Sequence, residues 1–337
     1  MTELPTTGTT RTTDAAPLPV AEISRLGRAI LDEVGTVVVG MHRPLELALA
    51  AILAGGHVLF EDVPGLGKTL AARSIAAAIG LDFRRLQCTP DLLPADITGS
   101  FVFAPASGEF VFRPGPLFTG LLLADEINRT SPKTQSALLE AMAEGRVTVE
   151  GEGFDLPHPF HVIATSNPIE YEGTYALPEA QLDRFLVRLA VGYPDRDGES
   201  AVLLNRVARR RESTNVRQVV DGDTLRRMQA GVEHIDVDSD IAAYCVDLAA
   251  ATRAHRQVQV GASPRGSQGL LLVARALAAL SARTFVTPED VKAVTVPVLA
   301  HRLSLTTQAW ASGVEPRHVV EEVTREVAGP PVVATAP

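Results

Sequence analysis

The sequence predicts an α/β fold: a parallel sheet with helices on both faces, followed by a small all-helical domain. Short apolar segments alternate with helical patterns up to residue 191, which is typical of a parallel sheet. A loop that contains glycine and lysine, EDVPGLGKT (61–69), joins the first strand to a helix. From residue 198 to about residue 325 only helical patterns follow. We therefore expect an α/β domain over 20–195 and a helical domain over 196–327.

The individual elements follow from apolar spacing and from flanking signals. Helical spacing covers 21–34, and Gly55 and Gly56 break the apolar region 47–60 into a helix and a strand. Pro132 and Gly145 mark the first turn and the end of a later helix. The expected strands are 57–61, 83–88, one within 120–128, 161–167 and 185–191. The expected helices are 21–34, 44–54, 69–80, 131–145, 198–211, 221–232, 239–254, 266–283, 288–300 and 315–327.

Composition and charge narrow the class of protein. The net charge of −9 argues against general attraction to nucleic acid or to anionic membrane. Residues 1–19 are rich in Thr and Pro and read as a disordered tail, and so do residues 328–337. No segment reads as a signal peptide or a membrane span. Cys88 and Cys245 have no paired pattern, so we expect buried free thiols in a cytoplasmic protein.

The loop EDVPGLGKT resembles a phosphate-binding loop, G-x-x-x-x-G-K-[ST], with Asp62 at the position of the first glycine. Such a loop points successive backbone N–H groups at phosphate, Lys68 would reach the β and γ phosphates, and the Thr69 hydroxyl would bind Mg²⁺. Asp62 precedes the turn, and its side chain can point away from the phosphates. The expected nucleotide-binding residues are Asp62, Val63, Pro64, Gly65, Leu66, Gly67, Lys68, Thr69 and Leu70.

Two polar strand ends complete the predicted site. LLLADE (121–126) is an apolar strand that ends in two acids; Asp125 would hold Mg²⁺ through water, and Glu126 would polarise an attacking water. In ATSNP (164–168), Asn167 follows the next strand along the chain and would orient that water. Without the lysine loop upstream, the acidic pair and the Asn-Pro turn would be ordinary strand ends.

Two arginines are candidates for stabilising transition-state charge. Arg184 lies in LPEAQLDRF (177–185), and Arg265 lies in SPRG (263–266) at the first turn of a helix. Each can also be a surface arginine paired with a carboxylate, such as Asp183 for Arg184. Spacing alone leaves both readings open.

Taken in order, VPGLGKT, LLLADEINR, ATSNP, LPEAQLDRF and GASPRG resemble the MoxR family of AAA+ ATPases over roughly residues 20 to 325. This family commonly writes its loop EDVPGxGKT, so Asp62 is an expected variant. The resemblance implies a P-loop AAA+ core with a helical lid, and ATP and Mg²⁺ as cofactors. It makes Asn167 sensor 1, Arg184 an arginine finger supplied to a neighbour, and Arg265 sensor 2. It also implies a ring, usually a hexamer.

Two further segments read as β-hairpins that resemble insertions of the same clade. FVFAPASGEFVFRPG (101–115) alternates phenylalanines about a turn, and RVTVEGEGFDLPHP (146–159) precedes the Asn167 strand. In the family such hairpins face the pore or a partner. A half-buried structural role has equal weight.

The resemblance implies an ATPase that remodels, assembles or matures other proteins, with a von Willebrand factor A domain protein as a partner or with a role in metal insertion. A nucleic-acid motor is an alternative, but the second hairpin carries Glu150, Glu152 and Asp155 and no lysine, whereas a phosphate-tracking loop should be basic. A magnesium-chelatase-like subunit shares the motor but resembles the motifs less. A scaffold without ATP turnover is disfavoured by an intact Glu126.

Overall fold

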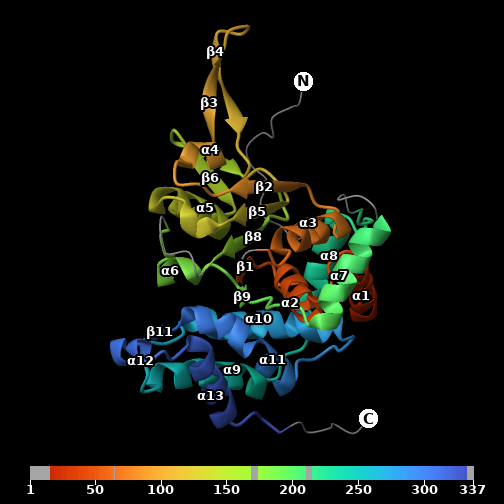
Figure 1. Ribbon diagram of the computed structural model, residues 1–337, viewed down its shortest axis with the longest axis vertical. Helices are drawn as coiled ribbons and strands as arrows, with labels where there is room; N and C mark the ends of the chain where they lie inside the picture. Colours follow the sequence, from red (N-terminus) through yellow and green to blue (C-terminus); the bar gives the residue numbers. More distant parts are fainter. Residues whose placement is uncertain (1–15, 64, 168–173, 210–214, 332–337) are drawn as a thin grey trace.

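The computed structural model describes residues 16–63, 65–167, 174–209 and 215–331. The chain forms an α/β layer with a helical bundle beneath it and a long hairpin projecting from the opposite end (Figure 1). The predicted tails, 1–19 and 328–337, lie partly outside the described residues, and Pro64 lies wholly outside them.

A five-stranded parallel sheet forms the centre of the α/β layer, in the order β2-β5-β8-β1-β9. The sequence predicted these five strands to within two residues at each end. They are β1 (Val58–Glu61), β2 (Phe83–Gln87), β5 (Leu121–Asp125), β8 (His161–Ser166) and β9 (Val187–Leu189).

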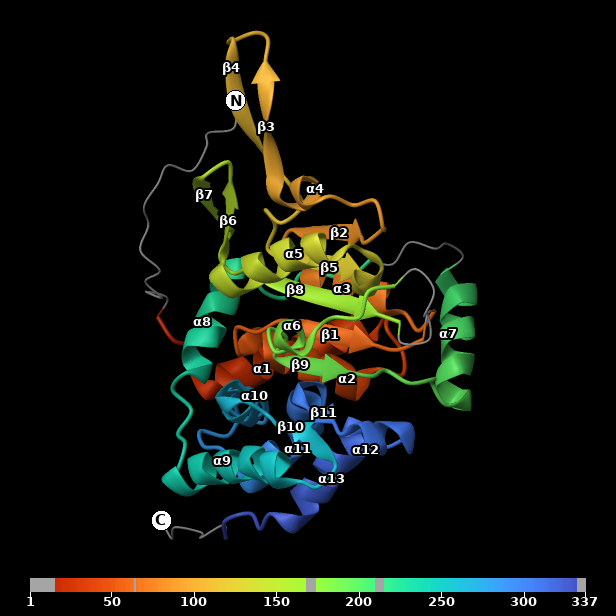
Figure 2. The same cartoon turned by 90° about the vertical axis from the view of Figure 1, so that its left-hand side faces the viewer.

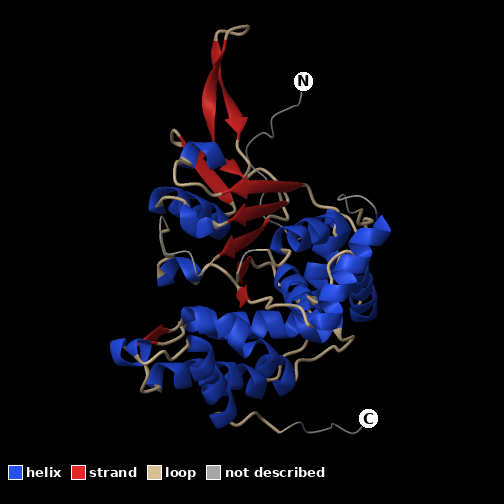
Figure 3. Ribbon diagram, in the orientation of Figure 1, coloured by secondary structure: helices blue, strands red, loops and turns tan. Residues whose placement is uncertain are grey.

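Alternate strand residues face two separate apolar cores, as the two-residue period of a strand requires. Phe60 and Leu123 belong to the core that also contains side chains of the helices α1 to α3 and of the lid, the helices that follow β9. Leu59 and Leu122 belong to the second core, which α5 covers. Helices therefore cover both faces of the sheet, as Figure 3 shows. They are α1 (Val20–Gly35), α2 (His42–Leu53) and α3 (Lys68–Ala78) on one face, and α4 (Pro94–Thr98) and α5 (Pro132–Glu144) on the other.

Both predicted hairpins are present. In the first, the cross-strand pairs Phe101–Phe112 and Phe103–Phe110 confirm the expected alternation. Phe112 stacks on Phe154 of the second hairpin with ring centroids 3.9 Å apart, so the base of the first hairpin is anchored there. The strands are β3 (Gly99–Ala104) and β4 (Glu109–Pro114), then β6 (Arg146–Val149) and β7 (Glu152–Asp155).

The lid side of the chain is less purely helical than predicted. A two-stranded antiparallel sheet, β10 (Val258–Val260) with β11 (Ser304–Leu305), lies where only helices were expected. Strands this short leave no two-residue alternation to read in the sequence. The helices are α7 (Arg196–Arg209), α8 (Gly222–Val232), α9 (Ser239–Ala254), α10 (Pro264–Leu280), α11 (Pro288–Leu299), α12 (Thr307–Ala311) and α13 (Pro316–Glu326), with the 3₁₀ turn η2 (Ala300–Arg302).

Hydrogen bonds join the α/β layer to the helices that follow β9 in the chain. The Ser24 hydroxyl of α1 donates to the Leu280 carbonyl of α10. The Gln229 amide of α8 donates to the Ile52 carbonyl of α2. Figure 2 shows α8 alongside α1, in the α/β layer, with α9 to α13 below. The helical region thus begins within the α/β layer and then continues into a separate bundle.

Both cysteines are buried free thiols, as predicted. Burial raises the pKa of Cys88 and of Cys245 to about 12, so neither thiol ionises near neutral pH. Among the described residues, no helix is long and apolar enough to cross a membrane.

Candidate functional site

The glycine-containing loop lies between β1 and α3, with α3 beginning at Lys68. Gly65 and Gly67 have φ values of 85° and 80°, a left-handed conformation that glycine adopts without steric cost. A Cβ atom at either position would meet nothing within 4 Å, so backbone conformation and not space requires glycine. This turn delivers Lys68 to the carboxyl end of the sheet.

The side chain of Asp62 points to the chain that follows β9. Its Oδ2 accepts hydrogen bonds from the backbone N–H groups of Val191, at 2.7 Å, and Gly192, at 2.6 Å. Its Oδ1 accepts from Val63 N–H. The aspartate at the place of the first glycine therefore anchors the loop to the β9–α7 connection.

Lys68 is largely buried and folds back over its own loop. Its ammonium group donates to the carbonyls of Asp62, at 2.5 Å, and Val63, at 3.2 Å. Burial lowers the pKa of Lys68, and the nearby carboxylates of Asp62, Asp125, Glu126 and Glu61 oppose that shift. A phosphate entering the loop can take over the hydrogen bonds that the two carbonyls now accept.

The hydroxyl of Thr69 and the carboxylate of Asp125 meet across the parallel strands. Thr69 Oγ1 lies 3.3 Å from Asp125 Oδ2. Asp125 Oδ1 accepts from Thr165 Oγ1 at 2.6 Å, and its Oδ2 accepts from Arg85 at 2.6 Å. A hydroxyl and a carboxylate at one point form a donor set that Mg²⁺ prefers, so these residues fit the implied ion.

Glu126 is the residue directly after β5, and its backbone is unusual. Its φ of 57° and ψ of 52° place a non-glycine residue in the left-handed region. Its N–H donates to Thr165 Oγ1 at 2.8 Å. Left-handed backbone at such a residue often marks a functional position.

The side chain of Glu126 is held by two donors: Arg129, which lies in the motif LLLADEINR, and Gln87, which no sequence pattern indicated. Its Oε2 accepts from Gln87 Nε2 at 2.8 Å and from Arg129 Nη1 at 3.1 Å. Gln87 lies two residues after Arg85 on β2, and β2 is the strand beside β5 in the sheet. The order of the strands in the sheet therefore brings Gln87 to Glu126. No local motif in β2 could have indicated it.

Asn167 follows β8 and is buried, with its carbonyl accepting from Asn128 Nδ2 at 3.2 Å. Because β1, β5 and β8 are adjacent and parallel, Lys68, Asp125 and Asn167 all follow the same edge of the sheet. The structure thus brings the lysine loop, the acidic pair and the asparagine together at one edge.

The two arginines lie elsewhere. Arg184 follows the short helix α6 (Glu179–Leu182), and its Nη1 donates to the Leu139 carbonyl of α5 at 2.5 Å. The guanidinium of Arg265, at the start of α10, is 4.0 Å from Asp183 Oδ2. The partner expected for Arg184, Asp183, is thus engaged by the lid.

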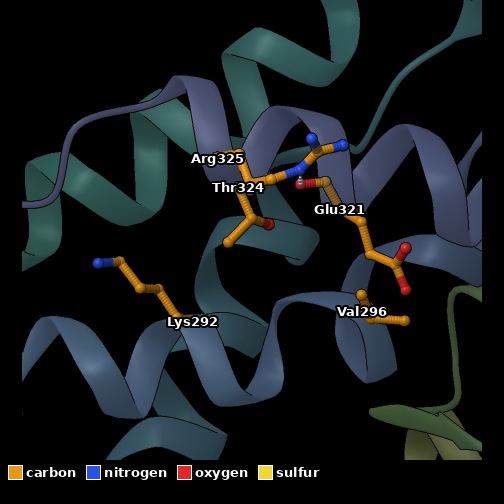
Figure 4. Close-up of a pocket in the computed structure, with 5 residues that line it drawn as sticks. All are labelled: Lys292, Val296, Glu321, Thr324 and Arg325. Atoms are coloured by element: carbon orange, nitrogen blue, oxygen red, sulfur yellow. Dashed lines mark hydrogen bonds between the residues drawn. The ribbon is translucent and has the colours of Figure 1, made fainter.

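The described residues contain a separate pocket of about 370 Å³ on the lid, between α11 and α13. Figure 4 shows its lining residues, Lys292, Val296, Glu321, Thr324 and Arg325. It belongs to the lid, and the loop and strand ends of the site contribute nothing to its lining.

The sheet order, the lysine loop and the acidic strand end define a P-loop ATPase of the AAA class. The family model described as "ATPase family associated with various cellular activities (AAA)" matches residues 57–187, and the model of the AAA lid domain matches residues 250–323.

Three comparisons then define the particular family. The chain is 46% identical to the uncharacterized protein YeaC of Bacillus subtilis, over 90% of this chain and 95% of that protein. It is 42% identical to chaperone MoxR1 of Mycobacterium tuberculosis, over 93% and 85% of the two chains. A crystal structure from Cytophaga hutchinsonii, 37% identical, superposes with a TM-score of 0.86 and covers 93% of this chain and 97% of that one. The chain belongs to the MoxR family of AAA+ ATPases.

Proposed function

We propose that the protein is a Mg²⁺-dependent ATPase that uses ATP hydrolysis to remodel, assemble or mature partner proteins. The observation that carries the proposal is the meeting of Thr69, Asp125 and Glu126 beside the lysine loop. The similarity to chaperone MoxR1 supports a protein as client. A von Willebrand factor A domain partner, a role in metal insertion and a cytoplasmic location stay predictions.

Each residue of the site has one task in this proposal. The loop and Lys68 bind the phosphates, which moves the lysine off the Asp62 and Val63 carbonyls. Thr69 and Asp125 would hold Mg²⁺, which when bound would neutralise charge on the phosphates. Glu126 takes a proton from the attacking water, and Asn167 orients that water.

Hydrolysis is also accelerated when an arginine stabilises the charge that develops on the transferred phosphoryl group. Arg184 bonds to α5, on the opposite face of the sheet from α3, and Figure 1 shows α6 and α3 on opposite sides of β1. We propose that Arg184 serves the site of a neighbouring subunit and that Arg265, on the lid, serves its own site. One active site is then built from two copies of the chain in a ring, predicted to be a hexamer.

Exposed apolar residues fit such a ring. On α7, Leu203, Leu204 and Val207 are 64%, 68% and 72% exposed. Figure 2 shows α7 at the edge toward which the strands β8 and β9 point, next to the connection that Asp62 anchors. Trp310, 76% exposed, lies on α12, on the opposite side of the molecule in Figure 1. An apolar patch on α7 and an exposed tryptophan on a different face suit a head-to-tail contact between copies, which closes into a ring.

Mixing two inactive variants tests the shared site. Glu126→Gln disables its own site but keeps its arginine, whereas Arg184→Ala keeps its own base but cannot complete its neighbour. We expect the mixture to regain activity at about one quarter of the interfaces, those that pair an intact Glu126 with an intact Arg184. If subunits exchange and the mixture stays inactive, Arg184 does not act across the interface.

A motor on nucleic acid is the main competing function. The acidic residues Glu150, Glu152 and Asp155 lie on or beside the strands of the second hairpin, which a phosphate backbone would repel. Binding to DNA at near-physiological salt that weakens steeply with added salt would favour the motor.

A further inference from the structure

The junction between the lid and the α/β layer is built around one buried guanidinium, that of Arg302. Its side chain is 3% exposed, and it lies in η2, at the end of α11. Burial lowers the pKa of Arg302, but its interactions with Asp183 oppose the shift and keep the charge. A buried charge of this kind is costly unless every donor is used.

The donors of Arg302 all point at the few residues around Arg184 or at its own helix. Nε donates to Asp183 Oδ1 at 2.7 Å. Nη2 donates to the Phe185 carbonyl at 2.8 Å, and Nη1 donates to the Leu186 carbonyl at 3.3 Å and to the Val298 carbonyl. The lid thus holds the chain by hydrogen bonds on both sides of Arg184.

The gripped segment is also tied to the α/β layer. Leu186 N–H donates to the His57 carbonyl at 2.9 Å, immediately before β1. Arg184 itself reaches the Leu139 carbonyl of α5. Residues 183–186 are therefore clamped between η2 on one side and β1 and α5 on the other, and this clamp sets the direction in which Arg184 leaves the backbone.

We propose that Arg302 is a positioning residue for ATP turnover that acts through Arg184, and therefore on the active site of the neighbouring subunit. The proposal rests on the proposed function, in which Arg184 crosses the interface. Arg302 touches neither nucleotide nor water in it. A movement of the lid would reach the next site in the ring through this clamp.

The geometry favours action through Arg184 over action through Arg265. Arg302 makes a close ion pair and backbone hydrogen bonds within residues 183–186. Its link to Arg265 is looser: the two guanidinium groups share Asp183, and the Arg265–Asp183 distance is 4.0 Å. Removing the guanidinium of Arg302 would therefore displace Arg184 more than it displaces Arg265.

Arg302→Lys keeps the positive charge and loses the planar fork. We expect ATP turnover to fall about tenfold to a hundredfold, since a small misplacement of a catalytic group costs that much, while the affinity for a fluorescent ADP analogue stays within about threefold. Arg317→Lys is the matched control. Arg317 lies on α13 and pairs at the surface with Glu321, so the ATP turnover of Arg317→Lys should equal that of the wild type.

Mixing experiments decide where Arg302 acts. Arg302→Lys mixed with Glu126→Gln should regain activity, because the intact base of the first then meets the properly held Arg184 of the second. Arg302→Lys mixed with Arg184→Ala should show no recovery above the average of the two variants alone, because neither supplies a properly placed arginine. Recovery with Arg184→Ala and not with Glu126→Gln would overturn the proposal, and so would wild-type turnover of Arg302→Lys.

Two controls separate this inference from the proposed function and from a folding defect. Glu126→Gln mixed with Arg184→Ala must regain activity; if that pair fails, the proposed shared site fails and not the role of Arg302 within it. If Arg302→Lys does not melt cooperatively or bind ADP, Arg302→Gln takes its place in the same mixtures. The same pattern is expected, and equal recovery with both partners would contradict the proposal.

Discussion

At the scale of single residues, Asp62 shows how a departure from a motif can be structural. The phosphate-loop pattern asks for glycine there. In this chain the carboxylate caps two backbone N–H groups, those of Val191 and Gly192, and so joins the loop to the segment that leads to α7. The aspartate therefore stabilises the loop through hydrogen bonds to a segment outside it.

Restoring the pattern should therefore harm the protein. Asp62→Gly removes the hydrogen bonds from Val191 and Gly192, and the one from Val63 as well, and we expect the free energy of unfolding to fall by about 1–3 kcal/mol. ATP binding should weaken as well, because the loop loses its anchor. Asp62→Asn keeps one acceptor oxygen, so its stability and its affinity for ATP should lie between those of the wild type and those of Asp62→Gly. Chemical denaturation and a nucleotide titration check this; a Gly variant more stable than the wild type would contradict the anchoring role.

The residues predicted from sequence were those carried by local motifs. Lys68, Thr69, Asp125 and Glu126 lie within short patterns whose chemistry is legible, and the fold brings them together. Gln87 and Arg302 were missed because their roles depend on neighbours 39 and more than 100 residues away along the chain. The alternative reading that pairs Arg184 with Asp183 fails for the same reason, since the carboxylate bonds to the distant Arg302 and Arg184 bonds to the Leu139 carbonyl.

At the scale of elements, a pair of buried histidines joins the strands to the helices behind them. His57 Nδ1 accepts from Val162 N–H at 3.0 Å, and its Nε2 lies 3.1 Å from the Met142 carbonyl. His161 Nδ1 lies 3.0 Å from the Gly56 carbonyl, and its Nε2 lies 3.1 Å from the Gln229 amide nitrogen. Both rings are satisfied when neutral, and burial lowers the pKa of each to about 4.

These shifts predict acid sensitivity. The unfolded chain takes up protons near pH 6.5, whereas the folded chain resists until about pH 4, so stability falls as the pH drops through that window. Each histidine accounts for at most about 3 kcal/mol. Denaturation at pH 7.5 and at pH 5 should show the loss. His57→Gln should reduce this loss of stability, whereas His318→Gln, on the surface of α13, should not. An equal loss between pH 7.5 and pH 5 in the wild type and both variants would contradict the role given to His57.

At the scale of the whole molecule, the arrangement of apolar surface predicts self-association. A helix with Leu203, Leu204 and Val207 exposed leaves apolar area in water that a second copy would cover. Leu203→Glu combined with Val207→Glu should therefore prevent ring assembly and lower ATP turnover together. Val246→Glu, at a 53% exposed valine of α9, is the matched control. Light scattering in the presence of ATP measures the mass, and unchanged assembly of the α7 variant would exclude this face.

The central claim is that ATP is hydrolysed at the edge of the sheet where Glu126 lies, with Glu126 as the base. The most direct test compares steady-state hydrolysis of ATP by the wild type and by Glu126→Gln, with nucleotide affinity measured on the same samples. We expect the variant to bind ATP as the wild type does and to hydrolyse it about 10²–10⁴-fold more slowly, because only the base is lost. Lys68→Ala should instead lose binding. Equal turnover by the wild type and Glu126→Gln would contradict the account.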